Sequence, residues 1–469
     1  MAEMVSLGFD PESWIRKGEE MGADYVDIRY QEHIYEIILL DNGVVRESTV
    51  SKSRGVGFRV FYKGFVGYAS TNDLNEPSLK NTLEQALRIA RALEGRSRPA
   101  RVASRGVHRE RVVSDYSIDP IDVDVSEKVD LLKAIHGTLR EEKALSSVVL
   151  RYAFEKDRRV IASSRGDYVD FTRRMVGVGG VLVAQAEGSM ERLSHGESRV
   201  AGWEFVKNFD WERLFRENAE LVVGALKAKT LPPGKYDVVL DNEMVGLLIH
   251  EAFGHASEAD IVMSGGSVLE NRVGSVVASE LVSIVDDGRV SGGVYLPYDD
   301  EGSPKVKVYL IEKGVFRGYL HNLETAGFFN ASPTGNGRSM TYADNVLVRQ
   351  TNIYLEPGDW DPYEIIQDTK RGVYLKGRGA SGGQVNPATG SFTFTSGPSF
   401  IIEGGEVQGM VRGVMIAGNI LETLLNVDAV GLDLEVKTSV FGGCGKGGQM
   451  VRVGDGGPHV RIRGVALGG

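Results

Sequence analysis

Helical and strand-like hydrophobic patterns alternate along the first half of the chain. From 79 to 93, apolar side chains recur at the three- and four-residue spacing of a helix that buries one face. Asp10-Pro11 and Gly22 bound an earlier helix, because aspartate caps, proline opens and glycine ends helices. Between these helices, Asp41-Asn42-Gly43 is a hairpin signal. The pattern predicts helices over 10–22, 79–93 and 126–139 and from Asp210 onward, with strands over 24–71 and 146–191.

The second half of the chain has a different pattern, which begins at the break Leu231-Pro-Pro-Gly234. Short strands dominate there, such as 391–395, where apolar and polar residues alternate strictly. One helix, over 243–255, is apolar on nearly every side and is therefore expected to be buried. The predicted strands cover 236–240, 281–285, 305–311, 315–320, 345–355, 391–395 and 459–465.

These patterns predict an α+β fold with two domains, as expected for 469 residues, since a single core rarely exceeds about 250–300. Residues 1–230 form an N-terminal α/β domain of helices and sheet. The order helix, sheet, helix occurs in it twice, as an internal duplication would produce. Residues 231–469 form a β-rich C-terminal catalytic domain that carries the buried helix. The 59 glycines favour many tight turns, and so a large content of sheet.

Composition narrows the function classes. A net charge of -10 argues against a protein that holds nucleic acid by its phosphates, so no nucleic-acid partner is expected. Six arginines in the segment 96–111 are expected to lie in a solvated loop, and we assign that segment no function. The first residues lack the features of a secretion signal, and no window resembles a membrane span. A single cysteine excludes an intrachain disulfide, which suits a reducing compartment. We therefore expect a cytoplasmic protein, and the absence of a membrane-span pattern predicts that it has no membrane partner.

The candidate metal ligands and an adjacent carboxylate lie on the buried helix, in the segment from His250-Glu251 to His255. Two imidazoles are good zinc ligands, and the carboxylate beside the first could polarise a metal-bound water, as in H-E-x-x-H metalloproteases. Here, however, the spacing is H-E-x-x-x-H, which places the histidines roughly 140° apart on a regular helix. For both histidines to bind one ion, the helix must widen by a π-bulge or end near Gly254. Otherwise, this is a buried helix with two hydrogen-bonded histidines.

A catalytic zinc usually has three protein ligands, and several residues compete for the third place. The candidates are Glu258, Asp260, His321, Cys444 and His459. Cys444 is the strongest, because its thiolate is soft and its glycine-rich setting with Lys446 favours ionisation. Glu258 and Asp260 look like carboxylates that orient a histidine, although Glu258 could also be a ligand. The alternation after His459 predicts that it points to solvent, and His33, His108, His136 and His195 look structural.

The chain resembles the TldD side of the TldD/PmbA family, the zinc metallopeptidases once called modulators of DNA gyrase. The motif His-Glu-Ala-Phe-Gly-His255 followed by Ser-Glu-Ala-Asp260 carries the resemblance. Further matching segments lie between about 236 and 469 and include Asp299-Asp-Glu-Gly302, Thr334-Gly-Asn-Gly-Arg338 and Cys444-Gly-Lys-Gly-Gly-Gln449. Arg338 and Lys446, within these segments, are candidates for contacts with substrate or with the ligands.

The resemblance implies a Zn²⁺ ion bound by His250, His255 and Cys444, and a catalytic subunit that pairs with a TldE-type subunit or with itself. It also implies unfolded peptides as substrates. In the mechanism we expect, Glu251 is the general base that takes a proton from the attacking water. Two other interpretations stay open. One is a non-enzymatic regulatory or partner-binding protein with a structural zinc; the other is a dipeptidyl-peptidase-like enzyme with a glutamate as third ligand.

Overall fold

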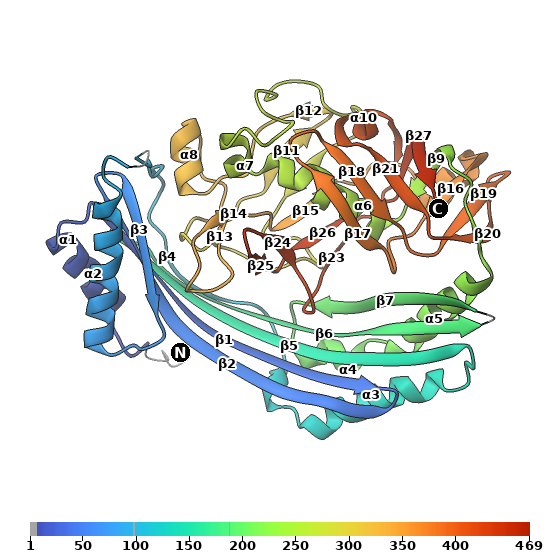
Figure 1. Ribbon diagram of the computed structural model, residues 1–469, viewed down its shortest axis with the longest axis horizontal. Helices are drawn as coiled ribbons and strands as arrows, with labels where there is room; N and C mark the ends of the chain where they lie inside the picture. The colour runs from blue at the N-terminus through green and yellow to red at the C-terminus, as the bar shows by residue number, and fades with distance from the viewer. Residues whose placement is uncertain (1–6, 97–98, 187) are drawn as a thin grey trace.

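A computed structural model describes residues 7–96, 99–186 and 188–469. A long curved sheet runs along one side of the molecule, and a β-rich part with short helices lies against its concave side (Figure 1). The predicted α+β fold is confirmed. Among the described residues, we find no helix with both the length and the apolar character needed to cross a membrane.

The curved sheet is built from seven strands of the first 199 residues, in the order β3-β2-β1-β5-β6-β4, with β7 paired to β6. The central β1 and β5 pair antiparallel, and each side of this pair continues into a hairpin. The strands are β1 (Tyr25–Asp41), β2 (Val44–Tyr62), β3 (Phe65–Thr71), β4 (Arg109–Val113), β5 (Leu145–Ser163), β6 (Tyr168–Ala186) and β7 (Ser189–Arg199).

The helices of this part cover the convex face of the sheet in two groups (Figure 1). The groups are α1 (Pro11–Glu20) with α2 (Glu76–Ala92), and α3 (Val125–Leu139) with α4 (Trp203–Asn208) and α5 (Trp211–Lys227). Each group has its own core against the sheet. The arrangement helix, three strands, helix thus appears on both sides of the β1–β5 pair, although the duplication itself stays a prediction.

Local sequence signals explain several of these elements. Asn42 and Gly43 have positive φ angles of 47° and 82°, as the predicted hairpin between β1 and β2 requires. Asp10 caps α1 by accepting a hydrogen bond from the backbone N–H of Glu12. Asp210 caps α5 in the same way. The predicted helix ends and turns are therefore confirmed where neighbouring residues alone determine them.

The β-rich part holds two larger sheets around one core. The six-stranded sheet has the order β12-β11-β10-β15-β26-β23, and the ten-stranded sheet has the order β17-β18-β21-β27-β9-β16-β19-β20-β8, with β22 paired to β27. Helix α6 (Asn242–Leu248) packs between β26 and β23 of the first sheet and β9 of the second. The buried position expected for this helix is confirmed, since Met244, Val245 and Leu248 belong to the core.

The strands of the six-stranded sheet are β10 (Ile284–Asp286), β11 (Val308–Glu312), β12 (Val315–Phe316), β15 (Asn352–Leu355), β23 (Glu435–Thr438) and β26 (Gly454–Gly457). Those of the ten-stranded sheet are β8 (Lys229–Thr230), β9 (Gly234–Leu240), β16 (Arg371–Leu375), β17 (Ser381–Asn386), β18 (Ser391–Thr395), β19 (Ser399–Glu403), β20 (Glu406–Arg412), β21 (Met415–Asn419), β22 (Val427–Val430) and β27 (Val460–Gly468). The two short hairpins are β13 (Gly337–Arg338) with β14 (Leu347–Val348), and β24 (Cys444–Lys446) with β25 (Gln449–Val451). The remaining helices are α7 (Ala259–Met263), α8 (Leu323–Phe329), α9 (Pro362–Asp368) and α10 (Ile420–Leu425).

The structure differs from several sequence predictions in this part and in the arginine-rich segment. The strand expected over 315–320 covers only Val315–Phe316. The strand expected over 305–311 begins only at Val308, because the Lys305 backbone N–H donates to the Pro297 carbonyl instead of to a neighbouring strand. The strand expected over 345–355 is split between β14 and β15. The segment 96–111, of which 97–98 lie outside the described residues, is not simply a solvated loop: Arg105 is buried against Asp167, and β4 begins at Arg109.

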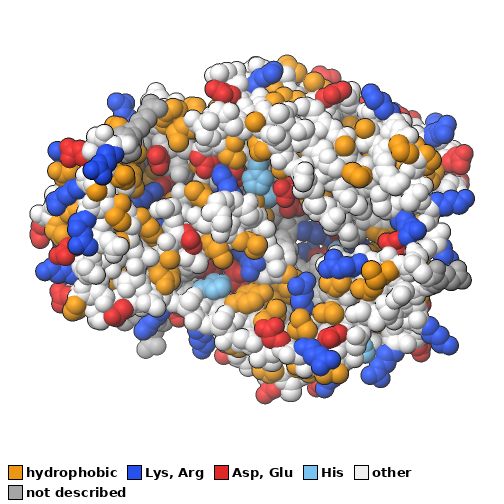
Figure 2. Space-filling model, viewed as in Figure 1, with side chains coloured by type: hydrophobic (Ala, Val, Ile, Leu, Met, Phe, Trp, Pro, Cys, Tyr) orange, Lys and Arg blue, Asp and Glu red, His pale blue; other side chains and the backbone are white. Residues whose placement is uncertain are grey.

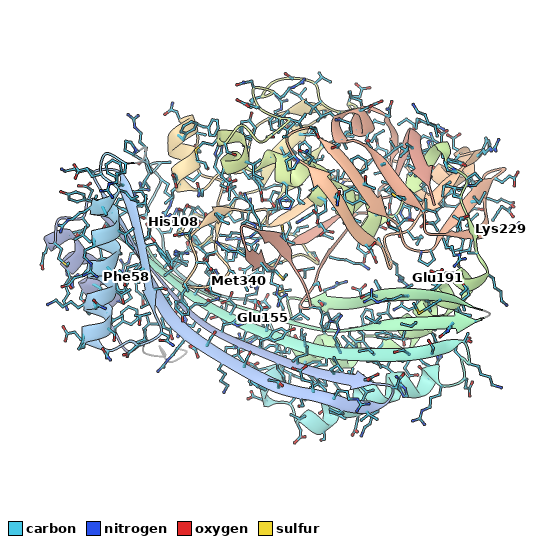
Figure 3. The ribbon with its side chains drawn as sticks, in the orientation of Figure 1. Phe58, His108, Glu155, Glu191, Lys229 and Met340 are labelled. Carbon is cyan, nitrogen blue, oxygen red and sulfur yellow. The ribbon has the colours of Figure 1, made fainter. Side chains whose placement is uncertain are left out.

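Ion pairs join the curved sheet to the β-rich part. Arg59 on β2 pairs with Glu301, Arg159 on β5 pairs with Asp300, and Arg452 pairs with Glu155 on β5. Figure 3 shows Glu155 and Met340 near one another, where the concave face of the sheet meets the β-rich part. A hollow opens between the two parts, with basic and acidic side chains at its margin (Figure 2).

Candidate metal centre

The helix that carries both motif histidines changes its winding between them. Asp241 caps α6 by accepting from the backbone N–H of Met244, and α6 ends at Leu248. A π-helical turn covers Ile249–Gly254, and a 3₁₀ turn covers His255–Ser257. The wider turn brings the rings of His250 and His255 to 5.4 Å between their centroids. The predicted widening of the helix is therefore confirmed.

The β24–β25 hairpin brings Cys444 to the same place from the end of the chain. The Cys444 Sγ lies 3.3 Å from the His255 Nε2. One donor atom from each of His250, His255 and Cys444 lies within 4.8 Å of the other two. The buried guanidinium of Arg349 donates to the Cys444 carbonyl and so fixes the hairpin. Two imidazoles and one thiolate thus converge in a buried site.

The electrostatics of this site favour a thiolate next to positive charge. Burial opposes ionisation of Cys444, but hydrogen bonds and charge from His250 and His255 outweigh it and lower the thiol pKa to about 5. Burial also opposes protonation of His255, but Glu258 and Cys444 outweigh it and raise the imidazole pKa to about 10. The Nδ1 of His250 is buried and has no hydrogen-bond partner among the described residues. This donor set fits a thiophilic divalent cation such as zinc.

Three charged side chains, Glu258, Lys446 and Asp260, form a series of contacts that begins at the Nδ1 of His255. The Nδ1 of His255 lies 3.1 Å from the Glu258 Oε2, and the Glu258 side chain is fully buried. The Lys446 Nζ donates to the same Glu258 oxygen at 2.9 Å and to the Asp260 Oδ1 at 2.7 Å. Burial raises the pKa of Glu258, but His255 and Lys446 outweigh it and lower the pKa to about 2. Glu258 therefore contacts His255 directly, whereas Asp260 is joined to Glu258 by Lys446.

Glu251 has a different environment, because its side chain is 34 % exposed. Its Oε2 lies 3.9 Å from the His255 Nε2. It lines a cleft of about 340 Å³ together with His250, Cys444 and Asp455. Sequence reasoning missed Asp455, whose pKa burial raises to about 6, because nothing in its glycine-rich segment marks it. A carboxylate next to the donor set and open to a cleft can exchange protons with a bound molecule.

The other candidates lie apart from these donors. His321 is packed against Tyr319 and Phe329, and burial lowers its pKa to about 4. The expectation that His459 points to solvent is wrong: its Nδ1 lies 2.7 Å from Asp433, and its Nε2 lies 2.8 Å from the Tyr374 hydroxyl. Arg338 is buried, with its guanidinium donating to the carbonyls of Gln350 and Arg452.

The four histidines of the first 230 residues also differ from one another. His33 lies 3.9 Å from Glu155, and His108 packs on Tyr298. The ring of His136 lies next to the Gly43 turn. His195, in contrast, lines the same cleft as Glu251. The position of His195 could not be read from its sequence neighbours, because β7 reaches the cleft only in the folded chain.

Gly254→Ala should destabilise the site. A Cβ at residue 254 would lie 2.0 Å from the Gln350 Oε1, and the buried Gln350 amide donates to the His250 carbonyl. Relieving this overlap should cost about 1–3 kcal/mol and displace the histidine turn. Thermal unfolding measures the effect, with Gly137→Ala as control because its Cβ would meet nothing within 4 Å. An unchanged melting temperature for Gly254→Ala would contradict the tight approach of Gln350.

Comparisons with known proteins cover nearly the whole chain. Family models match three segments: "PmbA/TldA metallopeptidase domain 1" at residues 26–90, the "central domain" at 118–226 and the "C-terminal domain" at 233–469. A metalloprotease of Methanothermobacter thermautotrophicus is 37% identical over 95% of this chain and 96% of its own length. A zinc metalloprotease TldD homolog of Saccharolobus solfataricus is 28% identical over 97% of this chain and 99% of its own.

Solved structures share the fold. A putative modulator of a DNA gyrase from Thermotoga maritima superposes with a TM-score of 0.81 at 22% identity, covering 97% of this chain and 98% of that one. TldE from Thermococcus kodakarensis superposes with a TM-score of 0.79 at 20% identity, covering 98% of this chain and 99% of that one. At these identities, the likeness concerns the fold alone.

Proposed function

The chain belongs to the PmbA/TldD family of metallopeptidases, and we propose that it hydrolyses unfolded or extended peptides with a zinc ion bound by His250, His255 and Cys444. It is a metallopeptidase. The observation that carries the proposal is the convergence of three donors next to a cleft that the partly exposed carboxylate of Glu251 also lines.

The donor set supports zinc over a hard cation. Mg²⁺ and Ca²⁺ prefer oxygen ligands, whereas two imidazoles and a thiolate are typical zinc ligands. When bound, zinc acidifies a water molecule and polarises the scissile carbonyl. The thiolate of Cys444 contributes negative charge to the site, so the general base carries more of the activation of water.

Glu251 is the proposed general base. Its partial exposure to the cleft leaves its carboxylate free to accept a proton from the attacking water and to deliver it to the leaving nitrogen. Glu258 cannot take this role, because it is fully buried and engaged by His255 and Lys446. Glu251, which follows His250, and Glu258, which follows His255, therefore have different proposed roles. Glu251 transfers protons, and Glu258 orients His255.

The rival interpretations fit the geometry less well. A structural zinc would have four protein ligands, whereas among the described residues the group around Cys444 contains three. A glutamate third ligand would have to be Glu258, but its Oε2 accepts from Lys446 and faces His255. Three protein donors next to a cleft would leave room for a water molecule or a substrate at a bound ion, which favours catalysis.

The proposed substrates are peptides in an extended conformation, because β7 and β23 line the cleft beside α6 and strands can bind an extended peptide through main-chain hydrogen bonds. The proposed assembly is a heterodimer with a TldE-type subunit or a homodimer, since the fold matches that of a TldE. Neither nucleic acid nor a membrane is a proposed partner. Hydrolysis of an unfolded peptide should be abolished by a chelator and restored by zinc, and the same sequence inside a folded protein should resist cleavage. Cleavage that persists in the chelator would contradict the proposal.

Lys446→Met should weaken zinc binding by about 10- to 100-fold, the usual effect of losing an outer partner of a metal ligand. The variant removes the ammonium that joins Glu258 to Asp260 behind His255. Zinc affinity is measured by competition with a chromophoric chelator. Lys307→Met removes a surface ion pair with Glu356 and should leave zinc affinity unchanged. Equal affinities for the two variants would show that Lys446 does not support the site.

A further inference from the structure

A second group of charged side chains lies in the same cleft as Glu251. Lys437 on β23 places its ammonium 2.6 Å from the Glu197 Oε1 and 2.8 Å from the Glu243 Oε1. Glu435 lies 3.7 Å from the same ammonium, and the His195 Nε2 lies 3.3 Å from Glu243. We call these five residues the Lys437 cluster. They come from β7, α6 and β23.

The Lys437 cluster is not a second metal site. One donor atom from each of His195, Glu197 and Glu243 lies within 4.8 Å of the others, as metal ligands would. However, the Lys437 ammonium is already within hydrogen-bond distance of two of these carboxylates. Burial opposes ionisation of Glu243, but His195 and Lys437 outweigh it and lower the pKa of this carboxyl group.

The cluster has more negative than positive charge. The Arg199 guanidinium also pairs with Glu197 at 3.2 Å, so two cations face three carboxylates and one negative charge is in excess while His195 is neutral. Two observations indicate that the excess is not used within the protein. The Glu435 side chain is 46 % exposed, and the one ion pair that it forms with the described residues, at 3.7 Å, is longer than a hydrogen bond. The side chain of His195 is 7 % exposed, and its buried Nδ1 has no hydrogen-bond partner in the part of the chain that the structure describes.

The distance between the Lys437 cluster and the metal centre indicates which part of a bound peptide would lie next to the cluster. Glu243 and His250 are seven residues apart on one helix, so they are roughly 10 Å apart along its axis. Both line the cleft. An extended peptide advances about 3.3 Å per residue. A peptide with its scissile bond at Glu251 therefore places a group about three residues away next to the Lys437 cluster.

We propose that the Lys437 cluster binds a primary ammonium group of the substrate, namely the N-terminal amine of a peptide cleaved about three residues from that end. Glu435 is the specificity-determining residue, because its carboxylate is exposed to the cleft and weakly paired. This inference rests on the proposed peptidase function. A lysine side chain at the same distance offers the same chemistry, and the experiment separates the two sources.

The experiment compares three peptides of otherwise identical neutral sequence with the zinc-loaded full chain. One has a free N-terminus, one is N-acetylated, and one is N-acetylated with lysine as its first residue. We expect kcat/KM for the free peptide to exceed that for the acetylated one by about 10-fold, mainly through KM, a size typical of a hydrogen bond to a charged group. Mass spectrometry should locate cleavage near the third residue. Rescue by lysine would assign the site to any primary ammonium, and failure to rescue would restrict it to the N-terminal amine.

Two variants change the preference in opposite directions. Glu435→Gln should reduce the preference for the free peptide to about 2-fold, because it removes the exposed carboxylate. Lys437→Gln should increase the preference, because it removes the competing ammonium. Glu364→Gln, on the exposed part of α9, is the matched control and should behave as the wild type. A merely structural role of the cluster would lower the melting temperature of the variants and leave the preference unchanged.

Failure of this inference is distinguishable from failure of the proposed function. Equal kcat/KM for the free and acetylated peptides would overturn the inference while the peptidase function stands. Faster cleavage of the acetylated peptide would also overturn it and would assign Lys437 to a substrate carboxylate. If no peptide is cleaved, calorimetric binding of the same peptides to the zinc-loaded protein decides: tighter binding of the free peptide supports the inference, and equal affinity or no binding overturns it.

Discussion

Glu251→Gln should retain zinc and lose hydrolysis, with kcat reduced by about 10³-fold, within the range that general acid–base catalysis contributes. The amide has nearly the shape of the carboxylate but cannot accept the proton of the attacking water. The zinc content should stay at the wild-type level, because neither His250, His255 nor Cys444 depends on Glu251 for a hydrogen bond. Metal analysis and peptide cleavage on the same sample measure both results.

The control for this variant is Glu220→Gln, on the exposed face of α5, which should retain both zinc and activity. Cleavage by Glu251→Gln at a rate near that of the wild type would exclude Glu251 as the base. Asp455 would then be the next carboxylate to test, because it also lines the cleft and its pKa is raised to about 6 by burial. Loss of zinc from Glu251→Gln would instead make Glu251 a ligand.

Cys444→Ala should lose zinc at concentrations that saturate the wild type, and activity with it. The variant removes one of three donors and the negative charge that faces the two histidines. Affinity should fall by more than about 100-fold, beyond the effect of losing an outer partner of a ligand. Chelator competition measures the affinity, and zinc-dependent cleavage of a peptide follows the activity.

The control for this second variant is Met450→Ala in the same hairpin, since the Met450 side chain is 50 % exposed. It should keep zinc, so a loss restricted to Cys444→Ala reports on the thiolate and not on the hairpin. Full zinc content in Cys444→Ala would make Glu258 the candidate for the third zinc ligand. In that case Glu258 would have to release Lys446, and Lys446→Met would strengthen zinc binding instead of weakening it.

The sequence by itself determined the features that neighbouring residues control. The cap at Asp10, the hairpin at Asn42-Gly43 and the buried helix after Asp241 follow from local preferences. The widened turn between His250 and His255 is also a feature that neighbouring residues determine. Two ligands at a spacing of five cannot meet on a regular helix, so the motif itself required the change of winding.

Only the tertiary structure decided which distant groups meet. Cys444 contacts His255 across 189 residues, and Lys446 reaches Glu258 across 188. The Lys437 cluster and Asp455 depend on how β23 pairs with β26 and on the approach of β7 to α6, where His195 pairs with Glu243. Residue types gave candidates for such contacts, but strand pairing over long separations selects among them. The physical reason is that side-chain chemistry is a local property of the chain, whereas the distance between two side chains is a property of the whole fold.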